Sequence, residues 1–260
     1  MFRYILTAIA LMTILTAPAL SQPLKLRVRY YLMTENETRA VGVVVCGDPM
    51  AVHVEVPLDG SEAAHQSHFS VPAWFGKTGV ARMTVARQRT EPTLDWLVST
   101  RQASLWKTEL QTAAPGEPTV IEMLDFVTLP VTVPGLPDES SETYDSPFPV
   151  GFRLAFTPEA SDSRTKDRRF QCRAQVHYLD FPETQAPLLC LDLHQEKFTL
   201  GADYGFYSFV GFWLAPILAL PDSQLGPKLR RMKENFPQAD MLMIMVTLEP
   251  SVDPPQPTGP

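Results

Sequence analysis

The chain has 260 residues, of which 45% are hydrophobic, and it carries a formal net charge of −7 at pH 7. This ordinary apolar content excludes a wholly disordered chain, and 25 prolines spread along the sequence disfavour long helices. The acidic balance argues against nucleic acid as a partner, because affinity for nucleic acid depends on basic patches.

The first 21 residues have the pattern of a cleavable secretory signal peptide. Arg3 provides a short positive region, an apolar run follows from Tyr4 to Thr16, and small residues then lead to a cleavage site before Gln22. The apolar run is short for a membrane span, so an uncleaved anchor is the weaker alternative. No cysteine follows it, so a lipoprotein anchor is not expected. We therefore expect an exported protein, located in the periplasm or outer membrane or, alternatively, outside the cell.

Alternating hydrophobicity predicts strands through the first half of the mature chain. In Leu24–Met33, apolar residues alternate with Lys25, Arg27 and Arg29, which is typical of a half-buried strand. Further strands are expected, in chain order, over Val41–Cys46, Val52–Val56, Val80–Arg87, Leu94–Ser99, Thr119–Val127 and Thr128–Val133, the last two punctuated by Pro118, Pro130 and Pro134.

The character of the sequence changes after residue 133. Pro134–Pro149 is polar, acidic and flanked by prolines, so we expect an exposed loop of about 16 residues. A strand resumes over Val150–Thr157. Arg168–Leu179 then alternates regularly between apolar and polar residues, and Leu188–Leu193 follows as its expected hairpin partner.

Near the C-terminus, Tyr204–Leu220 is the most apolar stretch after the signal and carries no charge. Gly211 and Pro216 interrupt it, so we expect a buried strand or hairpin, or a barrel strand that faces lipid, rather than a spanning helix. A single convincing helix is expected over Gln224–Phe236, with an apolar stripe and a basic face. A last strand is expected over Met241–Leu248, before a Pro-rich tail that we expect to be disordered.

These elements predict a mainly β, antiparallel sheet protein with one C-terminal amphipathic helix, in one or two β subdomains. The expected divisions are the signal peptide (1–21), an N-terminal β region (22–105), a second β region (106–249) and the tail (250–260). The two β regions are expected to join near residues 105–115.

The three cysteines suit the oxidising compartment that a signal peptide implies. Cys172 and Cys190 lie on neighbouring predicted strands, so a cross-strand disulfide between them is the first prediction. The strand register that would place them opposite each other cannot be read from the sequence. The alternative, three buried thiols that also include Cys46, is nearly as well supported.

The sequence offers no catalytic, cofactor-binding or metal-binding motif with supporting spacing, so a non-enzymatic protein is expected. His53, Glu55, His65 and His68 match no zinc signature, and solvated loop histidines are the favoured interpretation. The acidic residues of the segment Pro134–Pro149 lack the turn glycine and regular alternation of a calcium loop, so a solvated loop is favoured there too.

The order of elements in the second half resembles the C-terminal domain of secretins, the outer-membrane channels of type II and type III secretion and of type IV pili. The residues that carry the resemblance are, in order, Ala114–Ile121, Val150–Pro158, the strand pair within Arg168–Leu193, the apolar segment Phe206–Leu214, the Pro- and Leu-containing segment Leu220–Leu229 and the closing strand Met241–Pro250. The similarity covers about 140 residues, and the domains that normally precede the channel are replaced or missing.

The resemblance implies an oligomeric component of the cell envelope that serves secretion or pilus machinery, with itself or other envelope proteins as partners. In that family, strands from several subunits close a barrel. The residues expected to contact lipid or a neighbouring subunit are Tyr204, Phe206, Phe209, Phe212 and Trp213. The alternative function is a soluble periplasmic or extracellular β domain that binds a protein partner.

Overall fold

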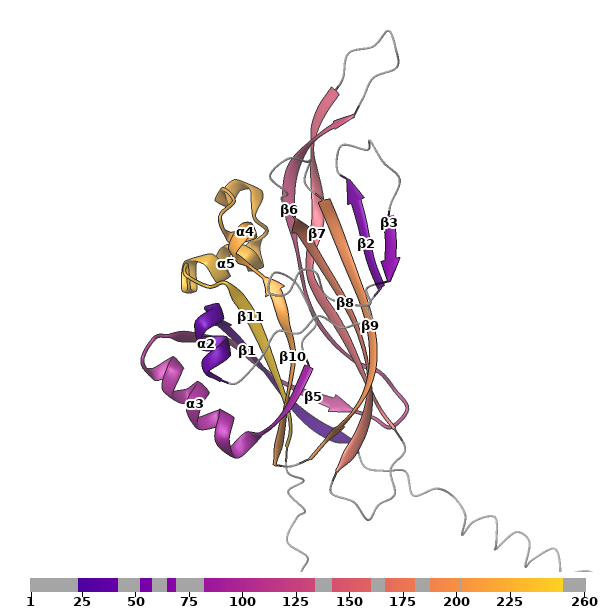
Figure 1. Ribbon diagram of the computed structural model, residues 1–260, viewed down its shortest axis with the longest axis vertical. Coiled ribbons are helices and arrows are strands. Elements are labelled where there is room, and N and C mark those ends of the chain that lie inside the picture. The colour runs from indigo at the N-terminus through magenta and orange to yellow at the C-terminus, as the bar shows by residue number, and fades with distance from the viewer. Residues whose placement is uncertain are drawn as a thin grey trace, which may run out of the picture.

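The computed structural model describes residues 23–41, 52–57, 65–68, 82–133, 142–159, 167–180, 188–201 and 203–249, and every structural statement below concerns these residues. The signal peptide, most of the expected strand Val41–Cys46 and the C-terminal tail lie outside the described residues. The described part is mainly β, which confirms the predicted fold class (Figure 1).

One antiparallel sheet has five strands. Its central strand, β11 (Met241–Leu248), pairs with β1 (Leu24–Met33) in a continuous register that runs from Leu26 opposite Leu248 to Met33 opposite Met241. Both strands have the bounds expected from the sequence. The full order is β4 (Arg82–Ala86), β10 (Tyr204–Trp213), β11, β1 and β5 (Ala103–Ala113).

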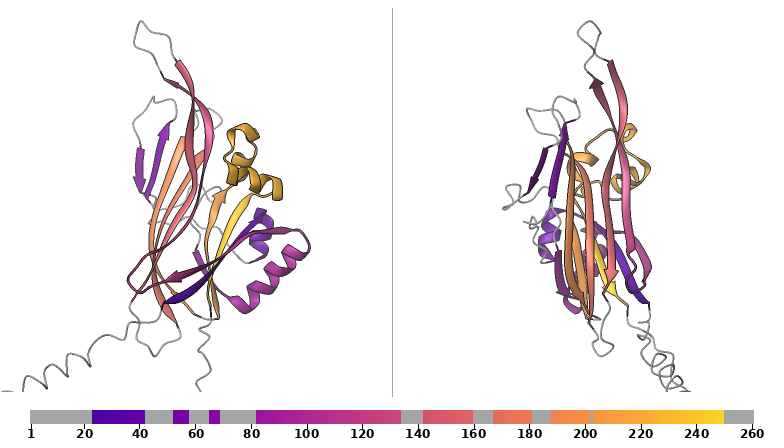
Figure 2. Two further views of the ribbon diagram at one scale, coloured as in Figure 1. Left: turned by 180° about the vertical axis from the view of Figure 1, so that it is seen from behind. Right: turned by 90° about the vertical axis from the view of Figure 1, so that its right-hand side faces the viewer.

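A second antiparallel sheet has six strands and is longer than the first. Its order is β3 (His65–His68), β2 (Val52–Pro57), β9 (Leu188–Leu200), β8 (Arg168–Asp180), β7 (Glu142–Pro158) and β6 (Thr119–Val133). The ends of β6 and β7 project beyond the rest of the sheet as a two-stranded ribbon (Figures 1 and 2).

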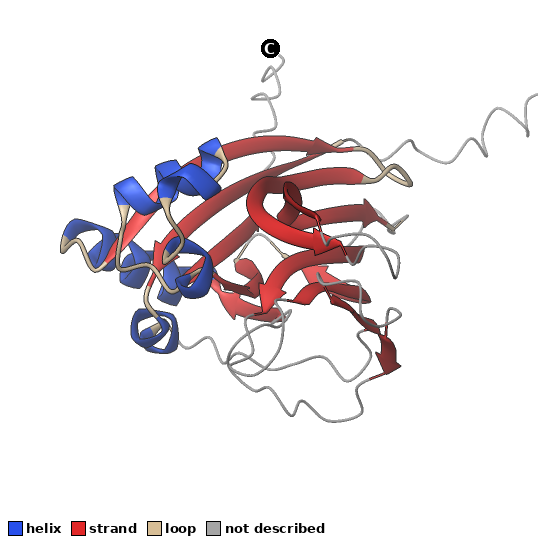
Figure 3. Ribbon diagram, turned by 90° about the horizontal axis from the view of Figure 1, so that it is seen from above, coloured by secondary structure: helices blue, strands red, loops and turns tan. Residues whose placement is uncertain are grey.

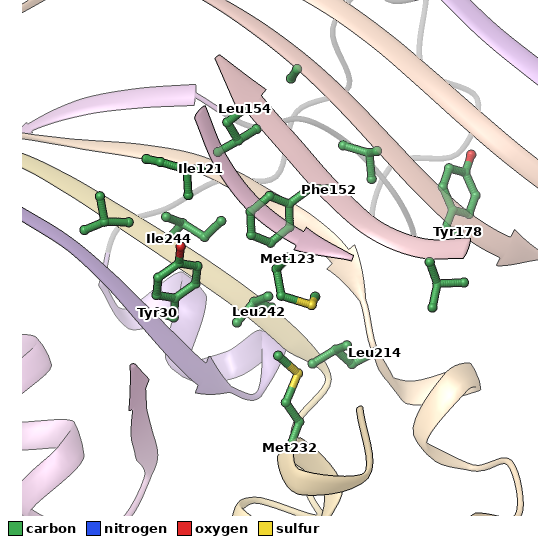
Figure 4. Close-up of a cluster of buried hydrophobic side chains, with 14 of the residues drawn as sticks. Tyr30, Ile121, Met123, Phe152, Leu154, Tyr178, Leu214, Met232, Leu242 and Ile244 are labelled. Atoms are coloured by element: carbon green, nitrogen blue, oxygen red, sulfur yellow. The ribbon is translucent and has the colours of Figure 1, made fainter. Parts of the chain in front are cut away.

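The main core lies between the two sheets. Alternate residues of β1 and β11 pack against alternate residues of β6, β7 and β8, as period-2 alternation requires. Tyr30 of β1 stacks on Phe152 of β7, with ring centroids 6.4 Å apart, and Leu242 and Ile244 lie beside them (Figure 4). Burial of these large side chains is the dominant favourable contribution to this fold.

A smaller core covers the opposite face of the five-stranded sheet. Leu94 and Leu97 of helix α3 (Arg87–Ser99) pack on the methionines at positions 241, 243 and 245 of β11. Strand β11 is therefore buried on both faces, which explains its unbroken apolar sequence. The expected strand at Leu94–Ser99 is wrong: spacings of three residues place Leu94 and Leu97 on one helical stripe facing the sheet.

The remaining helices gather at one end of the five-stranded sheet (Figure 3). They are α2 (Glu35–Ala40), α4 (Ala215–Leu218), the 3-10 turn η1 (Asp222–Gln224) and α5 (Pro227–Asn235). Helix α5 confirms the expected C-terminal helix, begins with Pro227 in its first turn and buries Leu229 and Met232. Among the helices described here, none has the length and apolarity needed to span a membrane.

The expected acidic loop is wrong in its second half, because β7 begins at Glu142 and pairs with β6 as far as Val133. The prolines of this segment favoured a loop in the sequence, but they are compatible with the strand. Pro147 and Pro149 lie where β7 has no second neighbour in the described sheet, since its pairing with β8 begins at Gly151. A proline can occupy such an edge position without loss of a ladder hydrogen bond.

The same reasoning explains why β6 continues through Pro130 as one strand. The Phe126 carbonyl points away from β7 and accepts a hydrogen bond from the Gly226 N–H at 2.7 Å. Because strand residues two apart point the same way, the missing N–H of Pro130 also lies on this outer edge.

The expected boundary between two β regions, after residue 105, does not coincide with the separation between the two sheets. The segment near residues 105–115 is β5 itself, an edge strand of the five-stranded sheet. Each sheet combines strands from before and after this point: β1 lies between β11 and β5, and β2 lies beside β9.

Candidate subunit interface

One side of the two-sheet structure is formed by consecutive strands. β5 is the last strand of the five-stranded sheet and β6 is the last strand of the six-stranded sheet, and only residues 114–118 connect them. The connection is a tight turn in which Gly116 has φ of +76° and donates its N–H to the Pro158 carbonyl at 3.1 Å. Thr119 Oγ1 donates to the Thr112 carbonyl at 3.2 Å, so the two sheet edges are held side by side.

Large apolar side chains are exposed along this side. Leu110 of β5 is 67% exposed and Phe126 of β6 is 53% exposed. Leu105 and Val120 on the same two strands are also exposed. Exposed apolar residues beside open strand edges are typical of surfaces that pair with another chain.

A groove of about 510 Å³ follows β5 where helix α3 leaves the sheet uncovered. The groove is lined by Arg27, Arg29, Tyr31, Asp95, Val98, Ser99, Leu105, Thr108 and Leu110. Its two arginines are already paired: Arg27 Nε lies 2.9 Å from Glu249 Oε1, and Arg29 Nη1 lies 2.6 Å from Glu91 Oε1. The groove therefore offers apolar contacts rather than an unpaired positive charge.

Between the sheets, this side is closed by a polar network. The buried Tyr30 hydroxyl donates to Glu109 Oε2 at 2.9 Å, and Glu109 also pairs with Lys107. Burial, and then the hydrogen bond to Glu109, raise the pKa of Tyr30 far above its usual value. Burial alone would raise the pKa of Glu109, but the hydrogen bonds from Lys107 and Tyr30 outweigh it, and the pKa of Glu109 is lowered.

The middle of the β6 edge is covered by the start of α5. Gly226 donates to the Phe126 carbonyl, Lys228 Nζ donates to the Leu124 carbonyl at 2.8 Å, and Val127 forms an isolated bridge with Leu225. Asp125 accepts hydrogen bonds from the first turn of the helix. In the described part of the chain, the outer edge of β6 is therefore open at its two ends and closed in its middle.

The strand orders of the two sheets also end in β4 and β3. β4 pairs only with β10, and β3 pairs only with β2, among the residues that the structure describes. β4 and β3 are thus the other two edge strands of the sheets, at the end of each strand order opposite β5 and β6.

The aromatic segment expected to contact lipid or a subunit forms β10, an interior strand between β4 and β11. Of its five named residues, Tyr204 is 46% exposed, and the side chains of Phe206, Phe209, Phe212 and Trp213 lie outside the described part. The end of the expected apolar stretch is core: Leu214, Ile217 and Leu218 are buried against the sheets.

The predicted Cys172–Cys190 disulfide is not formed, because the strand register keeps the two residues apart. Cys172 lies opposite Glu196 and Cys190 lies opposite Tyr178, so the two cysteines are offset by six positions along the β8–β9 pair. Six positions correspond to about 20 Å, far beyond the roughly 7 Å that a disulfide can span between Cα atoms. Both side chains are buried, in agreement with the alternative of buried thiols for these two positions.

Leu105 and Leu110 were not predicted as site residues, because no strand was expected over the residues that form β5. Lys107, Glu109 and Gln111 alternate with Thr108, Leu110 and Thr112, which is a strand pattern. The register shifts at Trp106, the extra residue on β5 between the partners of Tyr31 and Tyr30. A β-bulge of this kind interrupts the period and hides the strand from a pattern search.

No protein-family model matches the chain, and no curated protein matches it. The solved structures similar to it include two secretins. One is the InvG secretin domain β-barrel from the Salmonella SPI-1 injectisome, with 9% identity, coverage of 96% of this chain and 69% of that chain, and a TM-score of 0.30. The other is the type IV competence pilus secretin PilQ of V. cholerae, with 10% identity, coverage of 95% and 66%, and a TM-score of 0.28. The similarity to each of these two secretins is weak.

Proposed function

We propose that this protein is an exported, non-enzymatic subunit of a secretin-like assembly in the cell envelope, in which copies join side by side. The observation that carries the proposal is that the edge strands β5 and β6 of the two sheets lie side by side, while β4 and β3 are the other two edge strands. A second copy placed against the β5–β6 side meets the edges of both sheets at once. Such a head-to-tail contact closes into a ring when the rotation between copies allows it.

Strand direction favours the six-stranded sheet as the one that pairs edge to edge with the same sheet of the next copy. Neighbours in this sheet are antiparallel throughout, so its two edge strands, β6 and β3, run in opposite directions. Rotation about an axis along the strands then brings β3 of the next copy antiparallel to β6. In the five-stranded sheet, β5 would meet β4 in parallel, and parallel pairing is slightly less stable per residue.

The covered middle of β6 restricts where a neighbouring strand can pair. Leu225 and Gly226 occupy the edge beside Phe126 and Val127, and Pro130 removes a donor further along. The beginning of β6, around Val120, remains open. The short strand β3 is compatible with pairing there, beside the exposed Val120.

The sequence resemblance supports the same proposal. Two of its segments meet in the six-stranded sheet: Ala114–Ile121 covers the turn and the first residues of β6, Val150–Pro158 lies in β7, and Ile121 is opposite Leu154. Its closing segment forms β11, the strand buried on both faces. The signal-like N-terminus supports export. The corresponding place of action is the secretion or pilus machinery of the cell envelope.

The test is the assembly state of the protein made with its own N-terminus. Cells are fractionated, and detergent-extracted material is run on a sizing column. The proposal expects a large, membrane-associated oligomer. A soluble monomer that needs no detergent would contradict it and would favour the alternative of an exported β domain that binds a protein partner.

A matched pair of variants tests the edge contact itself. Val120→Pro removes the N–H that points away from β7, as Pro130 already does elsewhere in the strand, whereas Val120→Thr retains it. We expect the proline variant to lose the oligomer and the threonine variant to keep it, with equal thermal unfolding of the two monomers. An oligomer unaffected by Val120→Pro would exclude this edge as the contact.

A further inference from the structure

Four basic side chains lie on the face of the six-stranded sheet that turns away from the five-stranded sheet. Along β8, alternate residues from Phe170 onwards are buried between the sheets, so Arg169 and Arg173 point to the other face, where both are exposed. Arg153 of β7 and Lys197 of β9 belong to this outer face by the same alternation, and their side chains are 54% and 73% exposed. These four residues are called the basic stripe below.

The basic stripe advances along the sheet by two residues from each cation to the next. Arg153 lies opposite Gln175 of β8, and Lys197 lies opposite Gln171. Measured along β8, the four cations are therefore level with positions 175, 173, 171 and 169. Two residues of a strand correspond to about 6.6–6.8 Å. An extended chain laid along β8 would present its own alternate side chains at the same interval.

The stripe has more positive charge than the carboxylates beside it neutralise. Arg153 Nε lies 3.7 Å from Glu122 Oε2, and Lys197 Nζ lies 3.0 Å from Glu159 Oε1. The two arginines on β8 have no carboxylate partner among the side chains that the structure describes. The carboxylate of Asp167, just before β8, lies against the turn that follows β9. In a chain with a net charge of −7, this face is thus locally basic.

We infer that the basic stripe binds an extended acidic segment of a partner protein, laid along β8 with a carboxylate at every second position. The guanidinium groups of Arg169 and Arg173 match a carboxylate with two parallel hydrogen bonds each. Gln171 and Gln175 alternate with these arginines on β8 and offer hydrogen bonds to the backbone of such a segment. The exposed ion pairs of the stripe contribute little by themselves, so their cations remain available to the partner.

Two other kinds of anionic partner fit this face less well. Binding to a membrane surface grows with the apolar area that enters it, and single-stranded nucleic acid binds by stacking on aromatic side chains. In the described parts of β8 and β9, no large apolar or aromatic side chain is exposed. The exposed Val120 and Phe126 lie on β6, two strands from β8. The face therefore favours carboxylates presented by a protein, and a single copy is sufficient, independently of the assembly proposed above.

The test is the binding of a fluorescently labelled peptide of alternating glutamate and threonine to the purified full chain, measured by fluorescence anisotropy. We expect saturable binding that weakens as salt is added, because exposed charges are screened. A peptide of the same composition with its glutamates in one block should bind more weakly, since it reaches fewer positions of the stripe. A peptide with lysine in place of glutamate should not bind.

Two double variants with the same change in net charge test the position of the contact. Arg169→Gln combined with Arg173→Gln should weaken binding about 4- to 9-fold, since one exposed ion pair changes an equilibrium constant about 2- to 3-fold. Arg89→Gln combined with Arg231→Gln changes exposed residues of α3 and α5 and should bind like the parent. Both variants should unfold like the parent, because all four side chains are exposed.

Three results would overturn the inference. The first is no binding of the alternating peptide by the parent protein at low salt. The second is an equal loss in the two double variants, which would mean that only net charge matters. The third is tighter binding of phosphatidylglycerol vesicles or of an oligothymidylate than of the peptide, lost in the variant of β8, which would assign the stripe to a membrane or to nucleic acid.

Discussion

Asp125 Oδ2 accepts a hydrogen bond from the backbone N–H of Leu229 at 2.8 Å, and a second from Lys228 at 2.7 Å. The carboxylate comes from β6 and is 4% exposed. Gly226, at the N-cap of α5, has no side chain to satisfy the first turn of the helix, so Asp125, 103 residues before Lys228, performs that capping. One contact thereby ties the C-terminal helix to the edge of the six-stranded sheet.

Removing this remote cap should destabilise the protein. For Asp125→Ala we expect the free energy of unfolding to fall by about 1–2 kcal/mol, the range found when a capping side chain is lost. Part of the effect is the charge, which interacts favourably with the positive end of the helix. Urea unfolding monitored by circular dichroism measures the change.

The variant Asp125→Asn keeps an acceptor oxygen without the charge and should lose less stability than Asp125→Ala. Gly226→Ala is expected to disrupt the same junction, because a Cβ there would collide with the Asp125 carboxylate. If Asp125→Ala unfolds at the same urea concentration as the parent protein, the cap contributes nothing and this account of the junction is wrong.

Gly151 of β7 has a backbone conformation that other residues rarely adopt. Its φ is +129°, and a Cβ at this position would collide with the Met123 carbonyl oxygen on the paired strand β6. We expect Gly151→Ala to lower the free energy of unfolding by about 2–4 kcal/mol, because backbone strain and steric overlap add together. Thermal or urea unfolding reports the loss.

Gly116→Ala is the matched control for this prediction. Gly116 also has positive φ, at +76°, but nothing lies within 4 Å of a Cβ placed there. Only the conformational cost of about 1–2 kcal/mol should remain. Equal destabilisation by the two substitutions would show that steric overlap with β6 is not important at Gly151.

Burial of the two cysteines predicts slow chemical modification. Cys172 and Cys190 are 2% and 1% exposed, so an alkylating reagent should label them in the native protein far more slowly than in urea. Peptide mapping without reductant should show no fragment that joins Cys172 to Cys190. Recovery of that fragment from the folded protein would contradict the register of β8 and β9.

The strands whose bounds the sequence predicted correctly are buried either on one whole face or on both faces. In β1 alternation marks one buried face, and in β11 a continuous apolar run marks burial on both faces. Helix α3 was missed because Val98 and the two buried leucines also suit a strand, and only packing on the methionine face of β11 decides between them. Local propensity yields to tertiary contacts in such short segments.

The candidate interface was less accessible to sequence reasoning than the fold. Leu110 and Phe126 are ordinary strand residues, and their exposure depends on which strands end each sheet. The pairing of β1 with β5 and β11 joins segments far apart in the chain, and no local pattern encodes it. The cysteine prediction failed for the same reason, since register depends on turn geometry and burial together.

The network that closes the β5 side predicts a specific loss of stability in acid. The pKa of Glu109 is lowered from its usual value of about 4.5: burial opposes this shift, and the hydrogen bonds from Lys107 and Tyr30 outweigh it. A carboxyl group whose pKa is lower in the folded state stabilises that state above its unfolded pKa. This contribution is lost as the pH falls through the folded pKa.

We therefore expect Glu109→Gln to cost about 1 kcal/mol at pH 7, a modest value because Glu109 is partly solvated. The difference from the parent protein should shrink as the pH falls below about 4.5, because the parent loses the same charge. Urea unfolding at pH 7, 4.5 and 3 measures it. Glu91 and Asp222, whose pKa values are also lowered, remain in both proteins, so their acid losses cancel in the comparison. A difference that stays constant with pH would mean that the Glu109 charge does not stabilise the network, and that Tyr30 and Lys107 need only a neutral acceptor at this position.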